Sequence, residues 1–423
     1  MKKLILLFLL LTTLSGCSIS QRTNITGLLS APKRSETESE IVNVISDYLG
    51  ENITLKYSSS QGYTSPIQLI DITGDKTNEA VVFYHAPNKG TNIRFALLEY
   101  TDEKWNMVFD KEGLGSDVFY FDAVKFPDMV GKQIAVGYLV NGINENFFVT
   151  YFTEVQHPRD DYVEMCEDVV TKDLDGDGFK EILLTGSQSD GKVKIKALTM
   201  SAENGCKIVG TKVIRRGDVK ITQLQFAETD SGKTAVYVDY RDSANYIYTE
   251  AFTFEGSVAK NILCREAVSR AWPDESALNS QDMDGDGVPE IPVIIENNDN
   301  NMPDETEEHD VNFFIQWTDF SGQQEIVKML GVYNTQNNMF MALPPEWQGQ
   351  TYIKRESYGW SLMSLREENV LVKVTEGGHQ DDIKSGDYSY IVHKDAKSWI
   401  VEFGKEADSF QMEYMIKNIA VFD

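Results

Sequence analysis

A repeated pattern of short β-type runs is the feature that most constrains the fold of this chain. Between about residues 53 and 335, alternating β-branched and aromatic stretches are separated by Gly, Asn, Asp and Ser, a pattern typical of short strands joined by turns. Five runs align at intervals of 54, 48, 53 and 57 residues. The aligned runs are Val81-Val82, Ala135-Val136, Leu183-Leu184, Val236-Tyr237 and Val293-Ile294. Each interval has room for about four strands and their turns.

Repeats of this length are typical of the four-stranded blades of a β-propeller. We therefore predict a mainly β chain, with a β-propeller of at least five four-stranded repeats over residues 53–336. Residues 337–423 have further strand-like runs, then a helix-like segment from Asp408 to Ile416 and a last strand from Ile419 to Phe422. This order predicts a small α+β C-terminal domain.

The C-terminal segment opens with the short motif Leu343-Pro344-Pro345-Glu346-Trp347. This motif resembles the opening of a PsbP-like α/β module, which implies a separate domain over residues 337–423. A degenerate sixth blade with a tail is the alternative interpretation of the same residues.

The N-terminus has the layout of a secretory signal. Lys2 and Lys3 are followed by the apolar run 4–11 and by Leu14-Ser15-Gly16-Cys17. The last four residues resemble a bacterial lipobox, which implies cleavage of residues 1–17, a lipid on Cys17 and an anchor on the outer face of the cell membrane. An ordinary cleaved signal is the alternative. Residues 18–52 are interpreted as a polar tether and a short helix that ends at Gly50.

Three acidic loops precede strand-like runs, and their residues are numbered here as positions 1 to 9 of each loop. The second loop (173–181) and the third (282–290) have carboxylates at positions 1, 3, 5 and 9 and Gly at positions 4 and 6. The first loop (71–79) has Thr at position 3 and Lys at position 6. The candidate metal ligands are Asp173, Asp175, Asp177, Phe179, Glu181, Asp282, Asp284, Asp286, Val288, Glu290, Asp71, Thr73, Asp75 and Glu79.

Calcium accounts for this spacing, because it takes six to eight oxygen ligands in irregular geometry. Side chains at positions 1, 3, 5 and 9 and a backbone carbonyl at position 7 would supply them. We predict structural calcium in the second and third loops and leave both outcomes open for the first. An EF-hand is excluded, because it needs a bidentate Glu at position 12, and these loops have Val82, Leu184 and Val293 there.

A nine-residue acidic loop that enters a strand resembles the FG-GAP/VCBS-type repeat of integrin-α-like propellers. The resemblance covers roughly residues 66–336 and rests on the three loops. It implies a calcium-binding propeller.

Composition limits the partners. The chain has 39 basic and 66 acidic residues, a net charge of −27, which disfavours nucleic acid. Beyond Cys17 there are three widely spaced cysteines (Cys166, Cys206 and Cys264). This odd number favours single buried thiols over a disulfide framework, with one disulfide plus a free thiol as the alternative.

No sequence motif of a known catalytic class occurs in the chain. We expect a non-enzymatic, membrane-anchored surface protein whose propeller binds an extracellular protein or glycan. Two alternatives stay open: an extracellular hydrolase or lyase with its active site on the propeller face, and a purely structural component of the envelope.

Overall fold

The computed structural model describes residues 35–422, apart from 59–62, 64, 141–144, 154–158, 188–190, 245, 267, 272–277, 296–311, 357, 378–388 and 395–396. The predicted signal peptide, Cys17 and the tether as far as residue 34 lie outside the described residues. Within them, the chain is mainly β, as predicted from the sequence.

Most strands form consecutive antiparallel meanders, which we call units 1 to 6; a parallel strand contact joins the edges of units 3 and 4 into one nine-stranded sheet. Unit 1 is β2 (Ile67–Ile70), β3 (Glu79–His85), β4 (Arg94–Thr101) and β5 (Lys104–Glu112), with β1 (Thr54–Leu55) added at β3. Unit 2 is β6 (Asp117–Lys125), β7 (Lys132–Val140), β8 (Glu145–Phe152) and β9 (Arg159–Cys166). Unit 3 is β10 (Asp168–Lys172), β11 (Glu181–Ser187), β12 (Lys192–Ser201) and β13 (Gly205–Gly217). Unit 4 is β14 (Val219–Glu228), β15 (Thr234–Asp242), β16 (Tyr246–Glu255) and β17 (Val258–Asn261), with β18 (Val268–Ala271) added at β16.

Unit 5 takes strands from both ends of the C-terminal segment, and unit 6 is formed by strands that lie between them in the chain. Unit 5 is β19 (Ile291–Ile294), β20 (Asn312–Asp319), β21 (Ile326–Asn334), β22 (Met339–Ala342) and β28 (Ile419–Val421). Unit 6 is β23 (Thr351–Glu356), β24 (Gly359–Ser364), β25 (Val370–Glu376), β27 (Lys397–Phe403) and β26 (Ser389–Lys394). The five runs aligned in the sequence fall in β3, β7, β11, β15 and β19. The sequence period therefore locates an equivalent strand in each of units 1 to 5.

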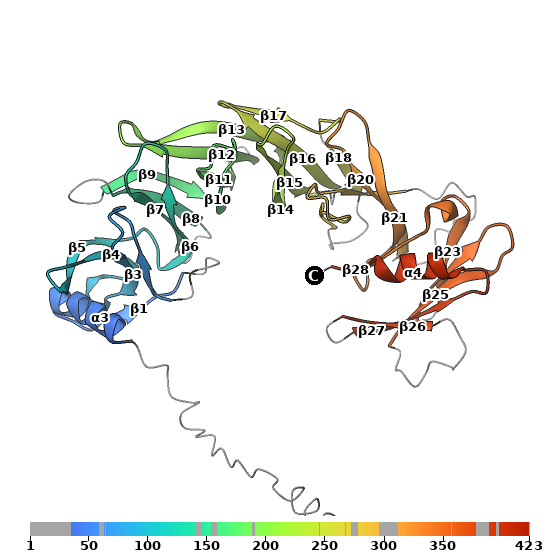
Figure 1. Ribbon diagram of the computed structural model, residues 1–423, viewed down its shortest axis with the longest axis horizontal. Helices are drawn as coiled ribbons and strands as arrows, with labels where there is room; N and C mark the ends of the chain where they lie inside the picture. Colours follow the sequence, from blue (N-terminus) through green and yellow to red (C-terminus); the bar gives the residue numbers. More distant parts are fainter. Residues whose placement is uncertain are drawn as a thin grey trace, which may run out of the picture.

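The units follow one another along an open arc, from α3 at one end to β26 and β27 at the other (Figure 1). Successive sheets bury side chains against each other, because neighbouring residues of a strand point to opposite faces. In β7, for example, Ile134 and Val136 pack in a core shared with unit 1, whereas Ala135 packs in a core shared with unit 3. Similar cores lie between units 3 and 4, 4 and 5, and 5 and 6.

Helix α3 (Glu36–Leu49) covers the outer face of the first sheet. Ser35 caps it through the N–H of Glu38, and Gly50 ends it with a left-handed φ of 70°. Its buried residues Ile41 and Ile45 pack in a core with alternate residues of β3 and β4. Without this helix, the first sheet would expose an apolar face that no preceding unit covers.

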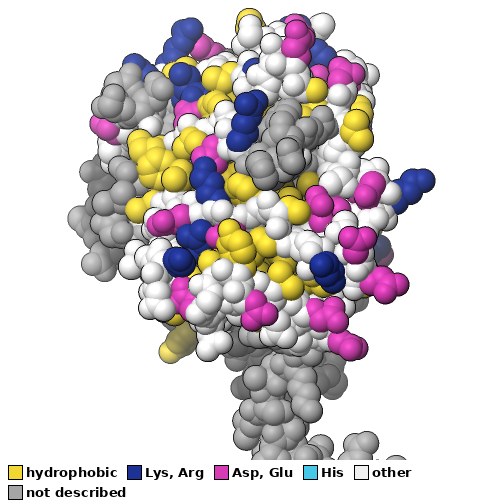
Figure 2. All heavy atoms as spheres, turned by 90° about the vertical axis from the view of Figure 1, so that its left-hand side faces the viewer, with side chains coloured by type: hydrophobic (Ala, Val, Ile, Leu, Met, Phe, Trp, Pro, Cys, Tyr) yellow, Lys and Arg dark blue, Asp and Glu magenta, His cyan; other side chains and the backbone are white. Residues whose placement is uncertain are grey.

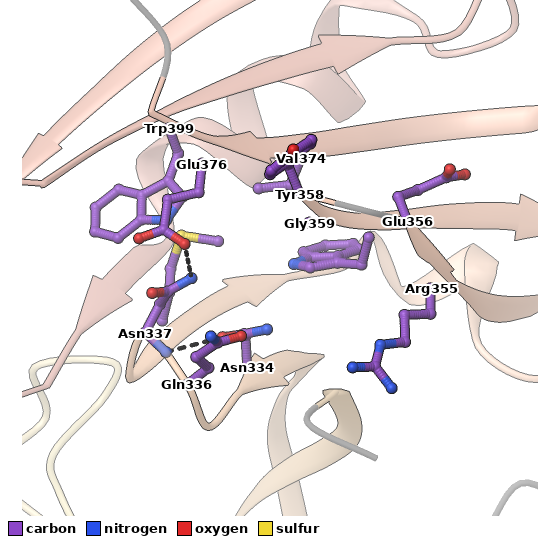
Figure 3. A pocket seen from close by; sticks show the side chains of 12 residues that line it. Asn334, Gln336, Asn337, Arg355, Glu356, Tyr358, Gly359, Val374, Glu376 and Trp399 are labelled. Atoms are coloured by element: carbon purple, nitrogen blue, oxygen red, sulfur yellow. Dashed lines mark hydrogen bonds between the residues drawn. The ribbon is translucent and has the colours of Figure 1, made fainter. Parts of the chain in front are cut away.

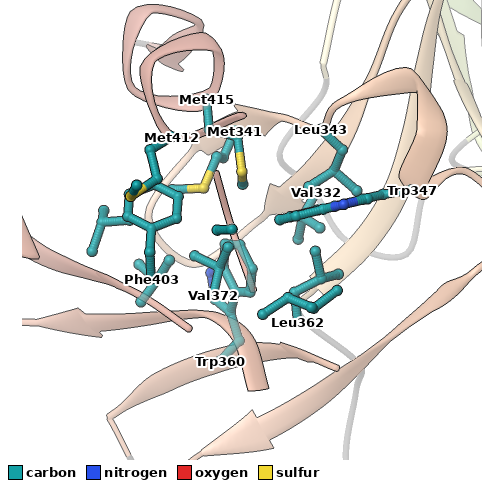
Figure 4. Packing of buried hydrophobic residues seen from close by; sticks show 14 of the residues in the cluster. Val332, Met341, Leu343, Trp347, Trp360, Leu362, Val372, Phe403, Met412 and Met415 are labelled. Carbon is teal, nitrogen blue, oxygen red and sulfur yellow. The ribbon is translucent and has the colours of Figure 1, made fainter. Parts of the chain in front are cut away.

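Units 5 and 6 share the largest core, together with α4 (Ser409–Lys417). Met341 of β22, Trp360 of β24 and Met415 of α4 are all at most 1% exposed and belong to this core. Figure 4 shows these side chains converging from the two sheets and the helix. After α4 the chain returns to unit 5, where β28 pairs with β22.

The surface at the α3 end of the arc is mixed. Figure 2 shows acidic and basic side chains interspersed there, with small groups of hydrophobic side chains between them. The negative net charge therefore does not form a continuous acidic face at this end. In the described part of the chain, none of the helices is long and apolar enough to cross a membrane.

Two of the acidic loops also connect units. The carbonyl of Leu174, at position 2 of the second loop, accepts a hydrogen bond from the N–H of Thr234 in unit 4 (3.1 Å). The equivalent carbonyl of Ile72 in the first loop accepts one from Lys132 in unit 2 (2.7 Å). The loops of units 1 and 3 thus dock on the next unit along the arc.

In the second loop, the contact with unit 4 leaves no room for a side chain at position 4. A Cβ on Gly176 would lie 2.2 Å from the carbonyl oxygen of Gly232, whereas a Cβ on Gly178 would meet nothing within 4 Å. Both glycines have left-handed φ angles, of 82° and 88°.

We expect Gly176→Ala to lower the thermal midpoint clearly more than Gly178→Ala. Both substitutions have the left-handed backbone cost of about 1 kcal/mol, but only the first also separates units 3 and 4. Thermal denaturation of the two purified variants beside the wild type measures the difference. Equal losses would show that the contact between Gly176 and Gly232 contributes nothing.

Candidate metal centres

The three acidic loops occupy equivalent places in alternate units. The first joins β2 to β3 in unit 1, and the second joins β10 to β11 in unit 3. The third leads into β19 of unit 5, and the isolated bridge between Gln281 and Glu290 closes its ends. Position 12 of each loop lies inside a strand, in agreement with the exclusion of an EF-hand.

All three loops share one pattern of hydrogen bonds at position 1. In the second loop, Asp173 accepts from the N–H of Gly176 through Oδ1 (2.8 Å) and from that of Gly178 through Oδ2 (2.9 Å). Asp71 and Asp282 accept from the same two positions of their own loops. The carboxylate at position 1 therefore fixes the curl of the backbone.

Positions 3 and 5 are oriented by short turns within the loop. Asp175 Oδ1 accepts from the N–H of Asp177 (3.2 Å), and Asp177 Oδ1 accepts from that of Phe179 (2.8 Å). Asp284 and Asp286 make the same two contacts in the third loop. These Asx-type turns hold Oδ1 of each carboxylate in place, so that Oδ2 is the oxygen that can reach a further partner.

Position 9 is a buried glutamate in every loop. Glu79, Glu181 and Glu290 are 2%, 7% and 0% exposed, and each accepts a hydrogen bond from the N–H at position 2. The pKa of Glu181 and of Glu290 is raised to about 7, mainly by burial and also by the charges of the neighbouring aspartates. Burial also raises the pKa of Glu79. A cation beside these carboxylates would offset the cost of keeping them charged.

Two of the loops bring three acids together. Carboxylate oxygens of Asp173, Asp175 and Glu181 lie within 4.8 Å of one another. The same holds for Asp282, Asp284 and Glu290. These clusters contain only oxygen donors, which hard cations prefer.

The other predicted ligands lie beside these clusters. Asp177 and Asp286 are outside the two groups of converging oxygens, and the residues at position 7, Phe179 and Val288, contact the carboxylate at position 5 through their N–H.

The first loop keeps the backbone pattern without the cluster. Asp71, Asp75 and Glu79 are all described, and they are not brought together in this way. The hydroxyl of Thr73 instead donates to Glu79 Oε1 (3.4 Å). Lys76 takes a left-handed φ of 76° at the position where the other loops have glycine. The loop therefore folds as the others do, with a hydroxyl beside the buried glutamate in place of a third acid.

The third loop has two features that the sequence did not reveal. Glu290 Oε1 is buried and has no hydrogen-bond partner among the described residues. Lys328 of β21 places its ammonium 2.9 Å from Asp284 Oδ2 and 2.6 Å from Asp286 Oδ2. Lys328 is 44 and 42 residues from these partners in the chain, so no local motif could have identified it.

The three described cysteines form no disulfide. Cys166 is buried and the other two are half-buried. Burial raises the pKa of the Cys166 and Cys206 thiols to about 12, which keeps both thiols protonated and poorly reactive near neutral pH.

A pocket of about 270 Å³ lies between units 5 and 6. Figure 3 shows Asn337 and Glu376 facing each other beside Trp399, with Arg355 and Glu356 further along the pocket. The Asn337 amide donates to Glu376 at 3.3 Å. The lining contains no histidine, serine or cysteine, so it lacks the usual pair of a nucleophile and a base.

Comparison with known proteins gives only distant similarities. No protein-family model and no curated protein matches the chain. A crystal structure of a protein from Lactobacillus plantarum is similar over 60% of this chain and 67% of that one, with 15% identity and a TM-score of 0.28. The AfRom2 CNH domain (13% identity, 84% of this chain, 100% of that one) and a europium-containing methanol dehydrogenase (8%, 77% and 85%) have TM-scores of 0.26 and 0.15. TM-scores this low carry no argument about fold or function.

We expect the double substitution Thr73→Asp, Lys76→Gly to convert the first loop into a third acidic cluster. Asp at position 3 replaces the hydroxyl beside Glu79, and Gly at position 6 removes a left-handed side chain. Isothermal titration with a divalent cation should then find one more site per chain than in the wild type. Lys76→Gly alone is the control: it should leave the number of sites unchanged and stabilise the fold by about 1 kcal/mol. An unchanged number of sites in the double variant would contradict the proposed role of position 3.

Proposed function

We propose that the protein is a calcium-stabilised, propeller-like interaction module, held at the outer face of a membrane by a lipid on Cys17. The observation that carries the metal assignment is the buried oxygen Glu290 Oε1. A buried carboxylate oxygen without a partner is costly, and a cation held by Asp282, Asp284 and Glu290 would satisfy it.

The donor set favours calcium over other metals. Each cluster offers carboxylate oxygens from positions 1, 3 and 9 and no nitrogen or sulfur. Zinc and copper prefer imidazole or thiolate ligands, and magnesium keeps most of its waters in a strict octahedron. Calcium accepts several carboxylates in irregular geometry, and its concentration outside cells suits loops of moderate affinity.

Calcium in the second loop would act where unit 3 meets unit 4. The loop that supplies Asp173, Asp175 and Glu181 also receives the hydrogen bond from Thr234. A cation that rigidifies the loop therefore stabilises the contact between two units. This supports a structural role for the metal, as in the FG-GAP/VCBS-type repeats that the loops resemble.

A rigid arc of sheets suits a binding role. Its units leave long edges and loops at the surface, where a partner protein or glycan can be contacted over several repeats at once. The pocket between units 5 and 6 is lined by no histidine, serine or cysteine, and we propose binding as the function. Repeated units, converging acids and the lipobox-like N-terminus together support an extracytoplasmic protein.

Saturating calcium should raise the thermal midpoint of the mature protein, because a ligand that binds only the folded state stabilises it. At a hundredfold excess over Kd, each site would add about 2.7 kcal/mol. Asp175→Ala and Asp284→Ala should each remove one bound calcium, measured by isothermal titration, and the double variant should remove both. Asp75→Ala in the first loop is the control and should leave the number of bound calcium ions unchanged. Identical melting curves in calcium and in excess chelator would refute the metal assignment.

The lipid on Cys17 has its own test. Cys17→Ser should move the protein from the membrane fraction to the soluble extracytoplasmic fraction of the producing cell. Fractionation and metabolic labelling with a fatty acid measure this. Label that persists in the variant, or a wild type that carries none, would contradict the anchor.

A further inference from the structure

The two acidic clusters differ in whether a lysine side chain of the protein bonds to their aspartates. In the third loop, the Lys328 ammonium bonds Oδ2 of both Asp284 and Asp286. Their Oδ1 atoms accept backbone N–H groups, so all four oxygens have partners. In the second loop, no described residue donates a hydrogen bond to Oδ2 of Asp175 or Asp177; Lys233 acts on Asp175 only through its charge.

A β-bulge places Lys328 at this position. Trp317 pairs with Met329 and Thr318 pairs with Val327, so Lys328 is the extra residue of β21. Bulges redirect the side chain of the unpaired residue. Here the ammonium reaches the acidic loop that leads into β19.

The same bulge occurs in the other units with acidic loops. In unit 3, Ala197 pairs with Gly210 and Leu198 with Ile208, so Val209 is the extra residue. In unit 1 the register shift between Leu97 and Leu98 leaves Val108 as the extra residue.

The residue at position 10 confirms that the three bulges are equivalent. In each unit it pairs with the residue next to the bulge: Ala80 with Leu98, Ile182 with Leu198 and Ile291 with Thr318. Lysine at the bulge is therefore particular to the third loop among these three units.

The surroundings of the two loops differ in a second way. Gly176 of the second loop is in close contact with the turn at Gly232, whereas nothing lies within 4 Å of a Cβ built on Gly285 in the third loop. Among the described residues, no neighbouring unit therefore lies against position 4 of the third loop. The side chains of Lys328, Asp284 and Asp286 are 22%, 31% and 40% exposed, so the ammonium can move into solvent.

We propose that Lys328 is a built-in competitor for metal at the third loop, which makes this loop the weaker and more readily reversible of two calcium sites. The proposal rests on the proposed function. An ammonium and a divalent cation repel each other strongly at contact distance, and charge-assisted hydrogen bonds to two carboxylates must break before calcium can use their oxygens. Calcium binding at this loop therefore requires release of Lys328, whereas the second loop binds without such a cost.

Lys328→Val introduces the residue that unit 3 has at the same bulge, and it tests the proposal directly. Asp175→Ala is used as the background, so that calcium binds only at the third loop. Isothermal titration should show an affinity about tenfold higher, or more, in Asp175→Ala/Lys328→Val than in Asp175→Ala alone, because an ion pair to two carboxylates is removed. Lys328→Arg keeps the cation and should leave the affinity close to that of the background.

Lys328→Val in the Asp284→Ala background, where only the second loop is intact, is the matched control and should leave the affinity unchanged. An unchanged or lower affinity of the third loop after Lys328→Val overturns the proposal, and so does an equal rise at both loops. If the Asp284→Ala variant binds no calcium either, the proposed function fails as well. If the second loop binds and the third responds as stated, both stand. Thermal denaturation of each variant with and without calcium is measured as well, to distinguish a change in affinity from a loss of the folded structure.

Discussion

Burial of both faces of each sheet is the constraint on which the rest of the structure depends. A four-stranded meander cannot cover its own apolar faces, so each unit needs a neighbour, and the cores lie between units instead of within them. In the part of the chain that the structure describes, no sheet precedes the first unit, and α3 takes that place through Ile41 and Ile45. At the other end, Met415 of α4 closes the core between units 5 and 6.

Much of this organisation could be predicted from the sequence. The aligned runs marked the equivalent strand of five units, because a strand buried on both faces needs consecutive apolar residues. The glycines at positions 4 and 6 indicated the tight curl, and all four have left-handed φ angles in the second and third loops. Alternation along a strand, however, does not say which neighbour each face will meet. Lys328 escaped prediction for a related reason: its contact depends on a bulge in a strand that is distant in sequence.

The three loops show that folding of the loop and convergence of its acids are separate properties, although both are encoded in the same nine residues. The first loop has the full hydrogen-bond pattern around Asp71 and docks on unit 2, yet it lacks converging acids. The side-chain hydrogen bonds that all three loops share come from positions 1, 5 and 9, and none of them needs an acid at position 3. The turn forms without an acid at position 3. Unit 1 can therefore keep the loop with Thr73 at this position, where units 3 and 5 have aspartate.

The docking of these loops also bears on the mechanics of the arc. Loop contacts join unit 1 to unit 2 and unit 3 to unit 4. Several side-chain contacts join the junctions between them, among them Thr171 to Asp122 between units 2 and 3 and Ser280 to Asp239 between units 4 and 5. Polar contacts therefore tie each junction from unit 1 to unit 5 in addition to a shared core. A pull at one end of the arc would be passed from unit to unit and would not concentrate at a single junction.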